Sequence, residues 1–134
     1  MRKTLLVIIC IMCTFLCSNT ALRSYGQYSD TWAYDLVHAV NSYGTTNNKP
    51  IHASILLFPG SGTIANYIGS LQKPVVAGGD IVSPQTGSTI SHYVVVYGYS
   101  DTHYICHFGW ANYSVVMLLK SNAMFGDGVV FSVY

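Results

Sequence analysis

Charged side chains are scarce in this chain of 134 residues. Lys and Arg number six, Asp and Glu number five, and together they make up 8% of the sequence. The basic residues form no cluster, so the chain lacks the positive surface that neutralises the phosphates of nucleic acid. The composition therefore excludes nucleic acid as an expected partner.

Cysteine is also scarce once the N-terminal segment is set aside. Cys10, Cys13 and Cys17 lie in that segment, and Cys106 stands alone in the rest of the chain. A protein with one thiol has no internal disulfide to hold it together. Its stability then depends on the modest core that a domain of this size can bury.

The N-terminal segment has the order of a secretory signal peptide. Two basic residues precede an uncharged apolar run at 5–17, and small polar residues follow it. The run is too short to span a bilayer comfortably, and we expect cleavage near Ala21. Residues 22–134 would then be secreted, with no stable membrane insertion. A lipoprotein signal at Cys17 fits less well, because bulky residues precede it, and an uncleaved anchor is the remaining alternative.

Two segments carry apolar residues at helical spacing. They are 31–43 and 63–72, and each is bounded by residues that begin or end helices. Gly44 is expected to end the first helix, and Ser61 or Thr63 is expected to cap the second. The sequence therefore predicts two short amphipathic helices.

Short apolar runs separated by turn residues predict the strands. They lie at 51–58, 73–79, 92–99, 103–110, 114–119 and 128–134, with residues 80–89 as a polar loop. Connections this short favour antiparallel neighbours, since a parallel pair needs a crossover. The sequence predicts a single α+β domain in which one or two helices pack on a small antiparallel sheet.

A glycine-rich segment between the first strand and the second helix invites a dinucleotide-binding interpretation. "GSGTIA", at residues 60–65, fits G-x-G-x-x-A, and Asp80 follows Gly60 by 20 residues. Pro59, however, interrupts the passage from strand to turn, and antiparallel strands follow where βα units would be needed. A turn that begins a helix is the better interpretation, and no cofactor is expected.

Four potential metal ligands lie close together in the sequence: His92, His103, Cys106 and His107. Along one strand, alternation directs Cys106 and His107 to opposite faces, whereas His103 and His107 share a face. The spacing is not characteristic of a zinc site, so we expect no metal.

Three runs in the second half of the chain resemble a known family. "KPVVAGGD", "HYVVVYGY" and "YICHFGW" follow one another as the C-terminal, histidine-bearing half of papain-like cysteine peptidases does, including secreted bacterial members. The resemblance covers about residues 63–134. It implies the β-rich half of a papain-like fold, hydrolysis of peptide bonds through a thioester, a peptide or protein as substrate or partner, and no cofactor.

The resemblance also assigns roles to three side chains. His92 matches the histidine that deprotonates the catalytic cysteine, and His107 stands where an orienting asparagine is usual. Trp110 matches the tryptophan that shields their hydrogen bond from water. If the hairpin turns near Asp101, we expect His92 and His107 to lie within hydrogen-bonding reach of each other, with Trp110 packed over them.

The nucleophile is where the sequence departs from the family. Thr31, in "DTWAY", occupies the cysteine's place, and its hydroxyl is a far poorer nucleophile. It lies 61 positions before His92, against roughly 130 to 150 in the papain group. Cys106 is the other candidate, but alternation turns it away from the face of His107, and a buried apolar role is expected.

Two functions are therefore compatible with the sequence. In the first, residues 22–134 are a papain-like peptidase-related domain that is truncated or degenerate, or that is completed by a separate cysteine-bearing piece. In the second, the chain is a non-catalytic exported binding or inhibitor-like module that keeps the same sheet. Eleven tyrosines and two tryptophans would give such a module ample contact surface.

Overall fold

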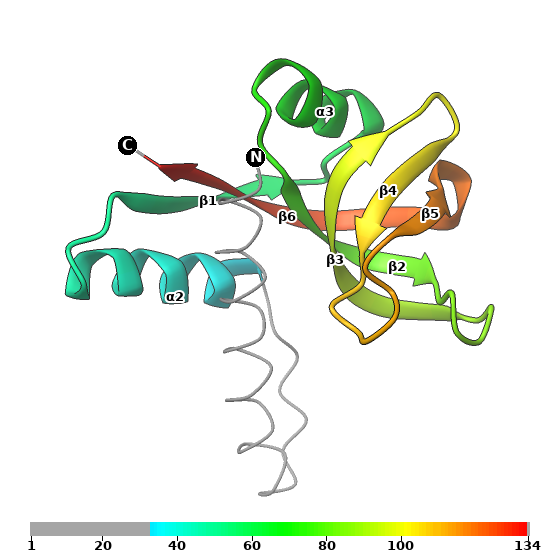
Figure 1. Cartoon of the computed structure of the whole chain (residues 1–134), viewed down its shortest axis with the longest axis horizontal. Helices are drawn as coiled ribbons and strands as arrows, with labels where there is room; N and C mark the ends of the chain where they lie inside the picture. Colours follow the sequence, from blue (N-terminus) through cyan, green and yellow to red (C-terminus); the bar gives the residue numbers. More distant parts are fainter. Residues whose placement is uncertain (1–32, 134) are drawn as a thin grey trace, which may run out of the picture.

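The computed structural model describes residues 33–133 as an α+β domain in which two helices pack on a six-stranded antiparallel sheet (Figure 1). The fold class expected from the sequence is thus confirmed. The predicted signal peptide at 1–21 and the candidate nucleophile Thr31 lie outside the described residues. Within the described range, no helix has the length and apolar character needed to cross a membrane.

The elements follow one another along the chain with short connections. They are α2 (Ala33–Thr46), β1 (Ile51–Leu57), α3 (Ser61–Ala65), the π-helical turn η1 (Asn66–Ser70), β2 (Val75–Val82), β3 (Thr89–Tyr99), β4 (His103–His107), β5 (Val116–Leu119), the 3-10 turn η2 (Lys120–Asn122) and β6 (Ala123–Val133).

The strands are ordered β1-β6-β2-β3-β4-β5, and each neighbouring pair is antiparallel. The expected antiparallel sheet is therefore confirmed. Because β6 lies between β1 and β2, the glycine-rich segment at 60–65 does not join two adjacent parallel strands. A dinucleotide-binding βαβ unit needs such a pair, and this part of the chain does not form one.

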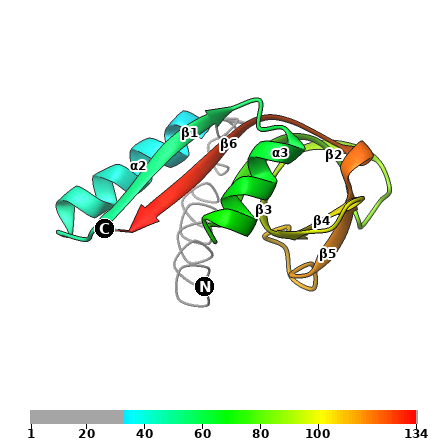
Figure 2. The ribbon, with the colours of Figure 1, turned by 90° about the horizontal axis from the view of Figure 1, so that it is seen from above.

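The two faces of the sheet carry separate cores. Strands β2 to β5 curl around the first core, with α3 beside them, and α2 lies along β1 and β6 over the second core (Figure 2). The first core comprises Ile64, Val75, Ala77, Ile81, Val94, Val96, Tyr104, Cys106, Phe108, Leu118 and Val130. The second core comprises Ala33, Leu36, Val40, Ala53, Val76, Val95, Val129 and Phe131. The middle of β3 is buried on both faces, and its sequence there is accordingly an uninterrupted run of valines.

Both predicted helices have boundaries that differ from expectation. The helix α2 continues past Gly44 to Thr46, and Gly44 is buried within it. A Cβ at this glycine would lie 2.6 Å from the carbonyl oxygen of Ile51, so Gly44 allows β1 to approach the helix closely. The helix α3 begins at Ser61, earlier than predicted, and the residue before it, Gly60, makes no side-chain cap.

The hairpin of β2 and β3 is longer than the sequence indicated. The predicted loop at 80–89 shrinks to 83–88, because Asp80 pairs with Ser91 and the ladder extends to Val82. These paired polar residues are exposed, which made the segment resemble a loop. As a consequence, His92 does not open a strand; it lies inside β3, opposite Gly79.

Candidate functional site around His92

His92 lies on the sheet face that carries the first core. Its neighbours at alternate positions of β3, Val94 and Val96, belong to that core, and strand alternation gives His92 the same side. The side chain is half-buried. It packs against two aromatic rings from the end of β4 and the loop after it, those of Phe108 and Trp110.

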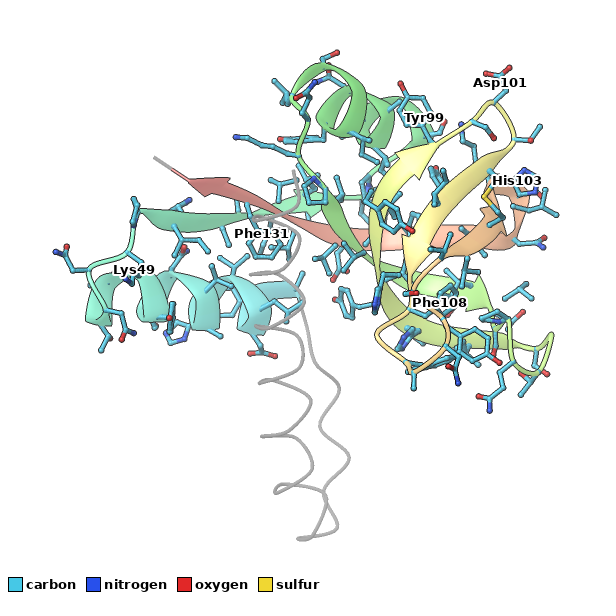
Figure 3. All side chains as sticks on the ribbon, in the orientation of Figure 1. Lys49, Tyr99, Asp101, His103, Phe108 and Phe131 are labelled. Carbon is cyan, nitrogen blue, oxygen red and sulfur yellow. The ribbon has the colours of Figure 1, made fainter. Side chains whose placement is uncertain are left out.

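The imidazole is fixed by one hydrogen bond and two ring contacts. Its Nε2 lies 2.8 Å from the carbonyl oxygen of Phe108. Phe108 follows β4, at the end of the strand opposite to the turn that contains Asp101 (Figure 3). The ring centroid of Trp110 is 4.7 Å away and that of Phe108 is 5.8 Å away. Trp110 therefore contacts His92, while its role as a shield of a catalytic hydrogen bond stays a prediction.

The hydrogen bond determines which nitrogen carries the proton. A carbonyl oxygen can only accept, so Nε2 of His92 must donate, and in the neutral ring the lone pair is on Nδ1. Burial lowers the pKa of His92 below its ordinary value of 6.5, with the bond to the Phe108 carbonyl acting in the opposite direction. At neutral pH the ring is therefore neutral, which is the state a general base requires.

His107 is not the partner of His92, and the expectation that the two rings lie within hydrogen-bonding reach is wrong. His107 pairs with Val95, which belongs to the second core, whereas His92 faces the first core. The two imidazoles thus project from opposite faces of the sheet. The Nδ1 of His107 instead accepts a hydrogen bond from the backbone N–H of Gly109, at 2.8 Å.

The orienting acceptor is the main chain of Phe108, which sequence analysis missed. The N–H of Phe108 donates to the Tyr113 carbonyl at 3.0 Å, and the N–H of Tyr113 donates to the Trp110 carbonyl at 3.2 Å. These bonds close a compact loop in which Gly109 adopts a φ of 80°. A side-chain motif gives no sign of a backbone acceptor. Counting residues outward from the turn of the hairpin, however, places the 108–110 segment beside His92.

Cys106 lies on the same face as His92 but is not within reach of it. It pairs with Val96, four residues along β3 from His92, a separation of about 13 Å at about 3.3 Å per residue. The thiol is fully buried, and burial raises the pKa of Cys106 to about 12. The expected apolar role is confirmed by its place in the first core beside Tyr104 and Phe108.

The candidate metal ligands do not converge. Cys106 and His92 face the first core, whereas His107 and His103 lie on the other face by alternation. The Nδ1 of His103 is 2.8 Å from the hydroxyl of Thr102, in the turn between β3 and β4. Among residues 33–133, no group of three or more His, Cys, Asp or Glu side chains could hold a metal ion.

Comparison with known proteins identifies the class of fold. No model of a known protein family matches the chain, and no curated protein matches it. Among solved structures, the chain is similar to the peptidase domain of Streptococcus ComA, a bi-functional ABC transporter involved in a quorum-sensing pathway. The TM-score is 0.53 and the identity 16%, over 81% of this chain and 71% of that domain.

The chain thus has a papain-like peptidase fold. At 16% identity the likeness concerns the fold alone. Because the match spans 71% of the ComA domain, it is wider than the C-terminal, histidine-bearing half that the sequence motifs indicated.

Proposed function

We propose that this chain is a secreted papain-like peptidase-related domain with a formed histidine site, for which residues 33–133 supply no nucleophile. In this proposal His92 is the general base and Trp110 shields its hydrogen bond from water. The ligand is a peptide or protein segment. Without a cysteine beside His92, the chain alone does not hydrolyse peptide bonds.

One observation carries the proposal, namely the hydrogen bond from Nε2 of His92 to the Phe108 carbonyl. It presents Nδ1 as the basic nitrogen, and the lowered pKa keeps that nitrogen unprotonated at neutral pH. No hydrogen bond from another residue within 33–133 engages Nδ1. A thiol placed beside this nitrogen could transfer its proton to the ring, as the chemistry of cysteine peptidases requires.

The reaction supported by the fold class would then proceed in two stages. The thiolate attacks the peptide carbonyl, and protonated His92 delivers its proton to the leaving amine, giving a thioester. Water, deprotonated by His92, then attacks the thioester and releases the thiol and the acid. Both stages need a sulfur at the ring, and Cys106 is too far away and too deeply buried to provide it.

The experiment restores the missing sulfur at the position that the resemblance indicates. Full-length protein and its Thr31→Cys variant are assayed against a fluorogenic peptide library. We expect no hydrolysis by the parent chain, hydrolysis by Thr31→Cys, and loss of that activity when His92→Ala is added. Hydrolysis by the parent that Cys106→Ala abolishes would overturn the proposal and make the chain a complete peptidase.

A second candidate function, a non-catalytic binding module, is favoured by the outermost strand. Near β5, which has one neighbouring strand among the described residues, Val115, Met117 and Leu119 are exposed apolar side chains. An extended peptide can add to such an edge through main-chain hydrogen bonds. If Thr31→Cys gains no hydrolysis while Met117→Lys abolishes peptide binding by the parent chain, this function replaces the first.

Export is a separate part of the proposal. We expect that protein recovered from the medium begins near Leu22, because residues 1–21 have the order of a cleaved signal peptide. Intact-mass analysis of the secreted protein measures this directly. Recovery of the intact N-terminus in a membrane fraction would contradict it.

A further inference from the structure

One peptide group connects the two histidines through the sheet. The carbonyl of Phe108 accepts from Nε2 of His92 at 2.8 Å, and the N–H of the next residue, Gly109, donates to Nδ1 of His107 at 2.8 Å. This carbonyl and this N–H belong to the same peptide unit. The C=O and N–H of a trans peptide point in opposite directions, and the two rings lie on opposite faces of the sheet.

We infer that His107 is a positioning residue for His92, acting through the peptide group between Phe108 and Gly109. It does not touch His92. It holds the N–H of Gly109, and because the peptide unit is planar, it thereby aims the carbonyl of Phe108 at the Nε2–H of His92. The inference gives a role to His107 within the proposed histidine site, and for that role it rests on the proposed function.

The peptide plane between Phe108 and Gly109 needs a hydrogen-bond partner to fix its orientation because the residue after Phe108 is a glycine. A peptide plane can rotate about ψ of the preceding residue and φ of the following one. Here the following residue is Gly109, at a φ of 80°, and glycine is permissive in this region. The local backbone alone therefore does not select one orientation of the plane, whereas an acceptor for its N–H does.

The surrounding bonds leave this plane as the variable part of the loop. The N–H of Phe108 is held by the Tyr113 carbonyl at 3.0 Å, and its side chain is fully buried in the first core. Within residues 33–133, the two histidines are the hydrogen-bond partners of the peptide group that follows. A polarised peptide also strengthens both bonds, since hydrogen bonds in a chain reinforce one another.

The test compares side chains at position 107 that keep or remove the hydrogen-bond acceptor for the N–H of Gly109. In His107→Asn, the side-chain oxygen replaces Nδ1 and can still accept from the Gly109 N–H. In His107→Leu, a carbon takes that place and no acceptor remains. His103→Leu is the matched control, because His103 lies on the same strand and face but bonds to Thr102.

Two quantities are measured by NMR in each full-length variant: amide exchange of Gly109 and the pH titration of the His92 ring. In His107→Leu we expect Gly109 exchange to accelerate by roughly fivefold to tenfold, the change that corresponds to about 1 kcal/mol of hydrogen bonding. The His92 pKa should fall, because the bond to the Phe108 carbonyl raises it in the parent. His107→Asn and His103→Leu should match the parent in both quantities.

Either of two results overturns the inference. In the first, His107→Leu leaves the Gly109 exchange and the His92 titration unchanged. In the second, His107→Asn disturbs them as much as His107→Leu does. If His107→Leu fails to fold, His107→Gln replaces it, since its oxygen reaches the position of Nε2 and not of Nδ1. None of these readouts measures hydrolysis, so this inference and the proposed function can fail independently.

Discussion

Cys106 is expected to be inert in the folded protein and to react only after unfolding. The thiolate is the reactive form of cysteine, and burial raises the pKa of Cys106 from 9.0 to about 12. A shift of that size lowers the thiolate fraction at neutral pH by about a thousandfold, since each pKa unit is a factor of ten. The side chain also has 0% of its surface exposed, so an electrophile cannot reach the sulfur without an opening of the first core.

The assay is labelling by iodoacetamide at neutral pH, read by peptide-resolved mass spectrometry so that Cys10, Cys13 and Cys17 are scored separately. The reference is a Gln85→Cys substitution in a Cys106→Ala background, which places a thiol at an exposed position of the β2–β3 loop. We expect native Cys106 to react at least about a thousandfold more slowly than this reference. In urea the two rates should converge.

Labelling of native Cys106 within about tenfold of the reference rate would refute the reasoning, since a tenfold change corresponds to one pKa unit and not to three. It would mean that the thiol is either exposed or held as a thiolate. If peptide hydrolysis were then lost on labelling, Cys106 would become the candidate nucleophile, and the incompleteness of the site would be disproved.

Three further predictions concern the surroundings of His92, the pH dependence of stability and the packing of α2. Trp110→Ala should raise the His92 pKa towards 6.5 in an NMR titration, because burial is the main cause of its lowering. Since unfolded chains bind the His92 proton more readily, the free energy of unfolding should rise with pH between the lowered pKa and 6.5, and His92→Gln should flatten this rise in urea titrations. Gly44→Ala should cost about 1–3 kcal/mol in urea unfolding through overpacking against Ile51. Gly62→Ala, which meets open space in α3, should be neutral or stabilising by up to about 1 kcal/mol.

The sheet could be predicted because its strands are short apolar runs between turn residues. The runs around 94–96 and 129–131 became β3 and β6, and the short turn at 100–102 became a hairpin in which Ser100 donates to the His103 carbonyl. The existence of two cores could not be predicted in this way. Val94, Val95 and Val96 are all buried, alternately in the first and second core, so no polar face remains to reveal the period of the strand.

Gly44 shows why a helix boundary escaped prediction. A glycine after a periodic apolar segment is typical of a helix end. Here the helix continues to Thr46, and the residue with a positive φ is Asn48, at 48°. Position 44 requires glycine because the carbonyl of Ile51 on β1 lies too close to leave room for a Cβ, and this is a tertiary contact. Local sequence contains no record of that distance.

The misplaced histidine pair was, in contrast, excluded by information within the sequence. Position 95 is three residues from His92, so the two side chains must lie on opposite faces of β3. A hairpin that turns near Asp101 puts His107 opposite Val95, as the structure does despite an irregularity between Val96 and Gly98. Completing the count would have given His107 to the other face and left the 108–110 segment as the neighbour of His92.

The geometry of His92 is compatible with catalysis, but it would also persist without it. Phe108 is fully buried, and Trp110 packs on the first core, so the rings that fix His92 contribute to the stability of the fold in any case. The acceptor of the Nε2–H is a main-chain carbonyl, which substitution of the Phe108 side chain does not remove. A chain that lost its nucleophile could therefore keep a well-oriented histidine through packing alone. For this reason the gain of His92-dependent hydrolysis in Thr31→Cys, and not a further description of the ring, distinguishes a peptidase site from a structural histidine.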